Sequence, residues 1–97
     1  MPRYITLWKY TDQGIRTITD SPKRAEAFRT MCEKRGGRVK DLYWTMGRYD
    51  GVAIVEAPDD VTMNAILYYQ SSLGNIRTGT LRASTAQEMS QALAKMV

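Results

Sequence analysis

The chain has 97 residues, of which 43% are hydrophobic and 25% charged, and its formal net charge is +4. This composition is ordinary for a folded protein, so it predicts one domain over residues 1–97 and excludes a disordered or low-complexity chain. No apolar run approaches the roughly 20 residues of a membrane-spanning helix, so we expect no membrane partner. The lone Cys32 excludes an internal disulfide, and we expect a cytoplasmic protein in a reducing compartment.

The first half of the chain predicts a strand, a loop, a helix and a second strand. Residues 3–10 alternate in a way that gives a strand buriable side chains on both faces. Residues 11–20 predict a long loop. A helix begins at Asp20-Ser21-Pro22, where a short polar cap precedes proline, and it ends at Gly36-Gly37. The second strand then runs over residues 38–46.

A strand, a tight turn and a further strand are predicted for residues 43–57. Gly47 and Gly51 bracket the loop Arg48-Tyr49-Asp50, and glycine readily adopts the positive φ angles that short hairpin loops often demand. The following run Val52-Ala53-Ile54-Val55 is apolar and rich in β-branched residues. Such a run is typical of a central strand that is covered on both faces.

The second half of the chain predicts a helix, a strand and a final helix. Pro58-Asp59-Asp60 ends the hairpin strand and begins the helix, with the acidic pair at the positive end of the helix dipole. A fourth strand covers residues 75–83. The last helix runs to about Met96, and sequence alone does not choose between two capping boxes at its start. These are Ser84 with Gln87 and Thr85 with Glu88.

The order of these elements predicts an α+β fold. Two β-α-β units with right-handed crossovers give a ferredoxin-like, four-stranded antiparallel sheet with two helices on one face, and a C-terminal helix follows. The other face of the sheet, which we expect to carry many of the aromatic side chains, is then uncovered. Such a surface usually marks an interface, so we expect a homodimer with the two sheets packed face to face. The aromatic candidates for this interface are Trp8, Tyr10 and Trp44.

Four stretches, which together cover nearly the whole chain, carry a family resemblance. They are residues 10–16, 20–24, 46–60 and 73–83. They resemble the GYD-domain family of the dimeric α/β-barrel group, whose name-giving signature corresponds here to Gly47, Tyr49 and Asp50. The resemblance implies a ferredoxin-like subunit and a sheet-to-sheet dimer. It implies little about chemistry, because the wider group includes cofactor-free monooxygenases, haem-handling enzymes and ligand-sensing modules.

Several kinds of chemistry are disfavoured by the residues present. The chain has no histidine, which removes the commonest metal ligand and the usual axial haem ligand, and we expect neither a cofactor nor a metal site. Cys32 lies on the apolar face of a predicted helix, which favours a buried, inert thiol. The third strand lacks the aromatic residues that RNA-binding sheets use for stacking, so we expect no nucleic-acid partner.

The candidates for ligand binding are polar and aromatic residues in and beside the hairpin: Tyr43, Arg48, Tyr49, Asp50 and Glu56. Two interpretations of Tyr49-Asp50 stay open. The pair either binds a polar ligand at the mouth of a cavity, or Asp50 accepts backbone N–H groups of the turn while Tyr49 packs over the core. Glu56 either contacts a ligand or pairs with an arginine, for which the candidates are Arg48, Arg77 and Arg82.

Two functions follow as hypotheses. The first is a homodimeric module that binds a small organic ligand or a partner, without established catalysis. The second is a cofactor-independent monooxygenase or isomerase of the dimeric α/β-barrel type, acting on a small aromatic substrate through Tyr43, Tyr49 and Asp50. The sequence does not decide whether the chain is an enzyme.

Overall fold

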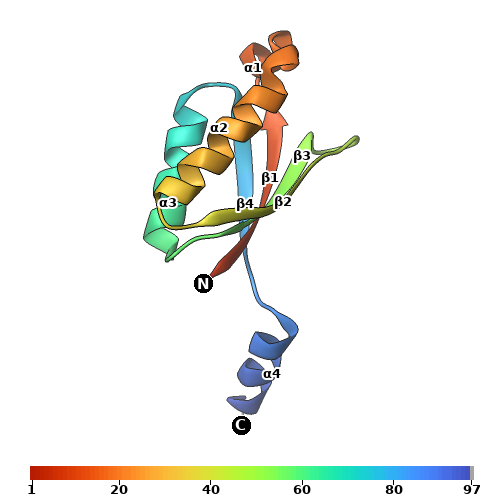
Figure 1. Cartoon of the computed structure of the whole chain (residues 1–97). Coiled ribbons are helices and arrows are strands. Elements are labelled where there is room, and N and C mark those ends of the chain that lie inside the picture. Colours follow the sequence, from red (N-terminus) through yellow and green to blue (C-terminus); the bar gives the residue numbers. More distant parts are fainter. Residues whose placement is uncertain (97) are drawn as a thin grey trace.

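The computed structural model describes residues 1–96, whose helices and strands are shown in Figure 1. In chain order they are β1 (Arg3–Tyr10), α1 (Asp12–Arg16), the 3-10 helix η1 (Ile18–Asp20), α2 (Ser21–Lys34), β2 (Arg38–Trp44), β3 (Gly51–Glu56), α3 (Asp60–Ser72), β4 (Ile76–Ala83) and α4 (Ala86–Ala94).

The four strands form one antiparallel sheet in the order β2-β3-β1-β4. The connections β1-α2-β2 and β3-α3-β4 place α2 and α3 on the same side of this sheet (Figure 1). The predicted ferredoxin-like α+β fold is therefore confirmed. Among the helices described over residues 1–96, none has the length and apolarity needed to cross a bilayer.

The core lies between this sheet and the two long helices. On β1, the side chains of Tyr4, Thr6 and Trp8 are buried toward the helices, while Ile5 and Leu7 point to the open face. The core residues are Tyr4, Trp8, Phe28, Met31, Cys32, Ala53, Val55, Ala57, Met63 and Ile66.

The prediction that aromatic side chains line the uncovered face is wrong for Trp8, Tyr10 and Trp44. All three lie on the face that the helices cover, where they line a pocket. Alternation along a strand separates two faces, but it does not say which of them the helices will cover. These three rings lie between helices and sheet, and aliphatic side chains occupy the centre of the open face, with Tyr43 beside them.

Residues 11–20 were expected to form a loop, and this expectation is wrong, because they fold into α1 and η1. The Thr11 side chain caps α1 by accepting a hydrogen bond from the Gly14 N–H. Gly14 packs so closely on the turn before β4 that a Cβ there would lie 2.0 Å from the carbonyl oxygen of Asn75. The segment is thereby held against the start of β4.

The two glycines of the hairpin act through different constraints. Gly47 has a φ of 106°, as its predicted role in the turn requires. Gly51 is not among the residues with positive φ. A Cβ there would lie 1.9 Å from the Trp8 ring, so Gly51 is required by the close approach of that indole.

The helix ends largely follow the predicted signals. Gly36, with a φ of 81°, follows the end of α2. Asp59 caps α3 by accepting from the Thr62 N–H at 2.8 Å. Of the two capping boxes considered for α4, the structure forms the one between Thr85 and Glu88.

Candidate functional site

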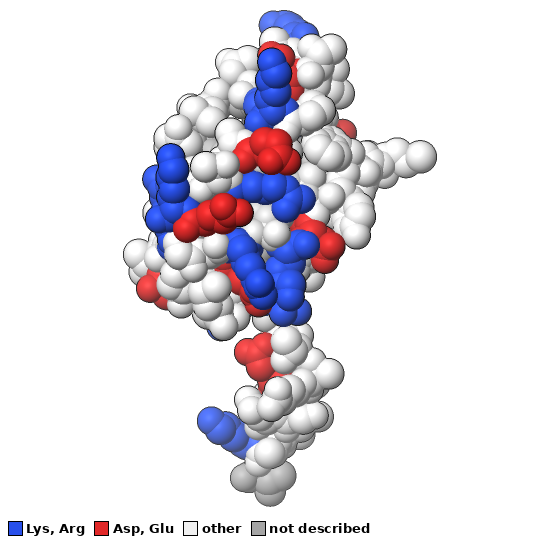
Figure 2. All heavy atoms as spheres, viewed as in Figure 1, with Lys and Arg blue, Asp and Glu red and all other residues white. Residues whose placement is uncertain are grey.

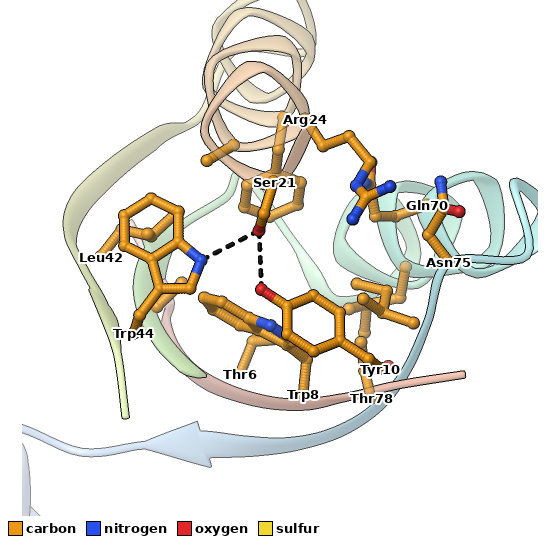
Figure 3. A pocket seen from close by; sticks show the side chains of 15 residues that line it. Thr6, Trp8, Tyr10, Ser21, Arg24, Leu42, Trp44, Gln70, Asn75 and Thr78 are labelled. Atoms are coloured by element: carbon orange, nitrogen blue, oxygen red, sulfur yellow. Dashed lines mark hydrogen bonds between the residues drawn. The ribbon is translucent and has the colours of Figure 1, made fainter. Parts of the chain in front are cut away.

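A mostly apolar pocket lies between the sheet and the helices α2 and α3 (Figure 3). Its volume of about 50 Å³ is several times the roughly 10–15 Å³ that one water molecule needs. Its apolar walls include Trp8, Phe28, Leu42, Trp44, Leu67 and Ile76. The Trp8 and Trp44 rings meet edge to face, with their centroids 6.5 Å apart. The pocket therefore offers aromatic and aliphatic surface to a small ligand.

The buried Ser21 hydroxyl joins two aromatic side chains of this pocket. The Trp44 Nε1–H donates to the Ser21 Oγ at 3.0 Å, and the Tyr10 hydroxyl is hydrogen-bonded to the same oxygen at 2.7 Å. The three groups carry three donor hydrogens, but these two bonds use only two of them. One hydroxyl hydrogen, on Ser21 or Tyr10, is thus left over from these bonds and can be given to an acceptor in the pocket.

Polar side chains line one side of the pocket. Figure 3 draws Arg24 from α2 beside Gln70 and Asn75. The Arg24 guanidinium donates to the Thr17 Oγ1 at 2.9 Å and to the Gly14 carbonyl at 3.2 Å. None of the ion pairs found among residues 1–96 involves Arg24. Its positive charge is therefore available to an acceptor or an anionic group at this side.

The five ligand-binding candidates named from the sequence do not line this pocket, whereas the three aromatic interface candidates do. Tyr43 is exposed on the open face, and the others lie in the hairpin or on β3. Sequence reasoning missed Ser21 and Arg24 as pocket residues. It interpreted Ser21 only as part of a helix cap, and it did not name Arg24 as a site residue. In the structure Asp20 holds the N-cap position without a side-chain bond, and the Ser21 hydroxyl points into the pocket.

Asp50 ties the hairpin to the end of β1. Its Oδ2 accepts from the Tyr10 N–H at 2.8 Å, and its own N–H donates to the Trp8 carbonyl at 2.8 Å. The Tyr49 ring lies beneath the Lys9 ammonium and the Arg48 guanidinium, which are 5.5 and 5.8 Å from its centroid. This geometry favours a structural role for Tyr49 and Asp50. The Asp50 carboxylate accepts its hydrogen bond from the backbone of β1, and not from the backbone of the turn as one interpretation had it.

Glu56 is held by two arginines from neighbouring strands. Its Oε1 accepts from the Arg38 Nε at 2.6 Å, and its Oε2 accepts from Arg3 at 3.2 Å. The Arg38 hydrogen bond is the largest influence and holds the pKa of the Glu56 carboxyl below its ordinary value, although burial acts in the opposite direction. The predicted partners were wrong, because the strand register brings Arg3 and Arg38 opposite Glu56.

The open face of the sheet is apolar at its centre. Cross-strand partners share a face, so Ile5 and Ile54 lie together, as do Leu7 and Val52. Leu81 continues this surface on β4 and Tyr43 on β2, and both are more than half exposed. Charged residues surround it, including Arg3, Lys9, Arg38, Glu56 and Arg77. We call this surface, centred on Ile5, Leu7, Val52, Ile54 and Leu81, the open-face patch.

The surface charges, the metal-ligating residues and the thiol of Cys32 do not indicate a further site among residues 1–96. Figure 2 shows Lys and Arg interspersed with Asp and Glu on the face that it views. Among residues 1–96 there is no cluster of three or more metal-ligating side chains. Cys32 is fully buried, and burial raises the pKa of its thiol to about 11, so the thiol stays protonated near neutral pH.

Replacing Asp50 tests its structural role. We expect Asp50→Ala to lower the free energy of unfolding by about 1.5–3 kcal/mol, because a hydrogen bond to a charged acceptor is lost and the Tyr10 N–H is left unpaired. Asp50→Asn should cost less, since its amide oxygen still accepts this bond. Urea denaturation measures both variants. Wild-type stability in Asp50→Ala would contradict this role.

The Glu56 ion pairs predict a pH dependence. Because the folded-state pKa is lowered, their stabilisation is present above the ordinary value of 4.5 and is lost as the pH falls through the folded-state pKa. Glu56→Gln should therefore unfold at a lower temperature than wild type at neutral pH, and this difference should shrink in acid. Thermal unfolding at several pH values measures it, with Glu26→Gln on the exposed side of α2 as the control. A difference that is constant with pH would contradict this account.

The chain was compared with known proteins. The family model described as GYD domain matches residues 4–93. A relative from Thermus thermophilus, named "Glutamine synthetase and cystathionine beta-lyase binding protein", is 36% identical over 84 residues, which are 86% of this chain and 88% of the relative. The crystal structure of TTHA0845, also from Thermus thermophilus, matches 89% of this chain and 96% of its own, with a TM-score of 0.57 and 24% identity, and so supports the fold alone. With a family model matching nearly its whole length, the chain belongs to the GYD domain family.

Proposed function

We propose that this chain is a homodimeric binding module that holds a partner protein and acts without catalysis. The observation that carries the proposal is the open-face patch, an apolar surface in the middle of the sheet that no helix among residues 1–96 covers. An apolar centre within a charged rim is the usual composition of a protein interface. The patch lies on the side of the sheet opposite α2 and α3, so a second copy can pack on it across a two-fold axis.

The partner protein is inferred from the relative. That protein is named for binding two enzymes, and its similarity to this chain extends over most of both sequences. A face-to-face dimer would use the sheets for self-association and leave α2 and α3 facing outward for a partner. The net charge of +4 favours an enzyme with an acidic surface. The single, buried Cys32 is compatible with the reducing cytoplasm, where we expect the module to work.

A second candidate function is the binding of a small carbonyl compound in the pocket beneath α2. It is supported by the hydroxyl hydrogen left over between Ser21 and Tyr10, which can be donated to a carbonyl oxygen. The volume of about 50 Å³ admits a carbonyl head. Catalysis through Tyr43, Tyr49 and Asp50 has less support, because none of them lines the pocket.

Sedimentation equilibrium tests the dimer. We expect the wild-type chain at micromolar concentration to have twice its mass of 11.0 kDa. Ile54→Arg, which places a charge in the open-face patch, should weaken the dimer at least tenfold. Tyr68→Arg makes a similar change on the exposed side of α3 and should leave the mass unchanged. A wild-type mass of one chain would contradict the proposal, as would an Ile54→Arg variant that still dimerises with wild-type affinity.

Sedimentation also tests whether the chain binds an enzyme, with purified glutamine synthetase and purified cystathionine β-lyase added in separate experiments. Co-sedimentation of the chain with either enzyme is expected, and it should weaken at high salt because the proposed contact is electrostatic. If the chain sediments alone with both enzymes at low salt, the proposed partner class is wrong.

Indole NMR signals test the pocket, because the two tryptophans of the chain both line it. Acetophenone, as a planar ketone, should shift the Trp44 indole N–H signal, and the double variant Tyr10→Phe/Ser21→Ala, which removes both hydroxyls that could donate to the ketone, should weaken its binding several-fold. Tyr68→Phe/Ser90→Ala, at exposed positions outside the pocket, is the matched control. Absence of a shift at millimolar ketone, or equal binding by Tyr10→Phe/Ser21→Ala, would contradict this site.

A further inference from the structure

The C-terminal helix α4 stands apart from the body of the protein. Figure 1 shows the chain leaving the end of β4 and forming α4 beyond the sheet. None of its residues is buried, and it makes no extensive contact with another helix or strand among residues 1–96. The Thr85–Glu88 capping box nevertheless gives it a defined N-terminus. The helix is therefore well specified locally but has no surface to pack on.

A helix of this length does not persist alone. It has nine residues, whereas isolated helices shorter than about 12–15 residues are only marginally stable in water. A capping box adds about 1 kcal/mol, which does not replace the packing that stabilises most helices in proteins. If α4 is to stay folded, another surface must cover one of its faces.

The sequence of α4 identifies that face. Met89 and Leu93 lie one turn apart on one side of α4, and Met96, two residues beyond its end, continues the same i, i+4, i+7 spacing. Each of the three side chains is at least half exposed. Gln87 and Gln91 lie on the polar side. The apolar stripe of Met89, Leu93 and Met96 is thus the surface that a partner would cover.

The dimensions of the chain favour a second copy as the partner. Its accessible surface of 6578 Å² exceeds the roughly 5,600 Å² expected for a compact monomer of this mass. Its radius of gyration of 14.7 Å exceeds the value of about 12.5 Å expected for its length. The surplus of roughly 1,000 Å² is close to the 800 Å² or so that each partner buries in a standard protein interface.

The position of α4 supports the same partner. Leu81 of the open-face patch lies on β4, only a few residues before α4 begins. The α4 stripe therefore follows closely along the chain after the surface proposed for the sheet-to-sheet contact. If an arm of one copy contacts the other across a two-fold axis, the same contact is made in return.

We infer that α4, together with the Met96 that follows it, is an exchanged arm, whose Met89, Leu93 and Met96 side chains pack on the body of a second copy of this chain. This inference rests on the homodimer proposed above. It adds that each chain completes the other, and that α4 is folded only in the dimer.

Amide hydrogen exchange on the full chain tests the arm. In wild-type protein at a concentration where it is dimeric, the α4 amides should be protected, and this protection should disappear on dilution to the monomer. Met89→Glu/Leu93→Glu should remove the protection and weaken the dimer at least tenfold. Gln87→Glu/Gln91→Glu adds the same charge on the polar side, and it should change neither the protection nor the affinity.

The outcomes separate the arm from the dimer itself. A dimer whose α4 amides are unprotected, or one that is unaffected by Met89→Glu/Leu93→Glu, overturns the arm but leaves the sheet-to-sheet dimer intact. Protection of α4 in a monomer shows that it docks on its own chain and also overturns the arm. A wild-type chain that stays monomeric at every concentration with α4 unprotected overturns both proposals.

Discussion

Two helices can cover only one face of a four-stranded sheet, and the rest of this structure follows from that constraint. The helices α2 and α3 cover the side to which Tyr4, Thr6 and Trp8 point, and the core forms there. The other side keeps the open-face patch, because the strands alternate and their second set of apolar side chains has no helix above it. A small chain of this kind buries a modest fraction of its surface, so self-association is a direct way to stabilise it.

The hairpin and the pocket beneath α2 have different roles. The hairpin that carries the family signature has a structural role. The Asp50 carboxylate accepts a hydrogen bond from the β1 backbone, and Gly51 leaves space for the Trp8 ring. The pocket beneath α2 contains the Ser21 and Tyr10 hydroxyls, which have one hydrogen left over for a ligand. Binding surfaces on both sides of one sheet are what a module needs if it is to join a second copy and a further partner.

The sequence predicted the four strands and the helices α2, α3 and α4 in order, because these depend on local signals such as the polar residues and Pro22 at the start of α2. It missed the short helices α1 and η1, and it indicated the family through a resemblance over four stretches of the chain. It did not predict the partners of Glu56, because the register that brings Arg3 and Arg38 beside it is a long-range property. Nor did it predict the pocket, since the Ser21 hydroxyl meets Tyr10 and Trp44 only after three elements have packed together. Local patterns thus predict elements, and the candidate site depends on their assembly.

The central claim is that a second copy covers the open-face patch. An isotope-filtered NMR experiment on a mixture of labelled and unlabelled chains tests it most directly, because it detects only contacts between copies. The account predicts contacts from the methyl groups of Ile54 and Leu81 to a second chain. A filtered spectrum in which neither residue contacts another copy, recorded at a concentration where the protein is fully associated, would contradict it.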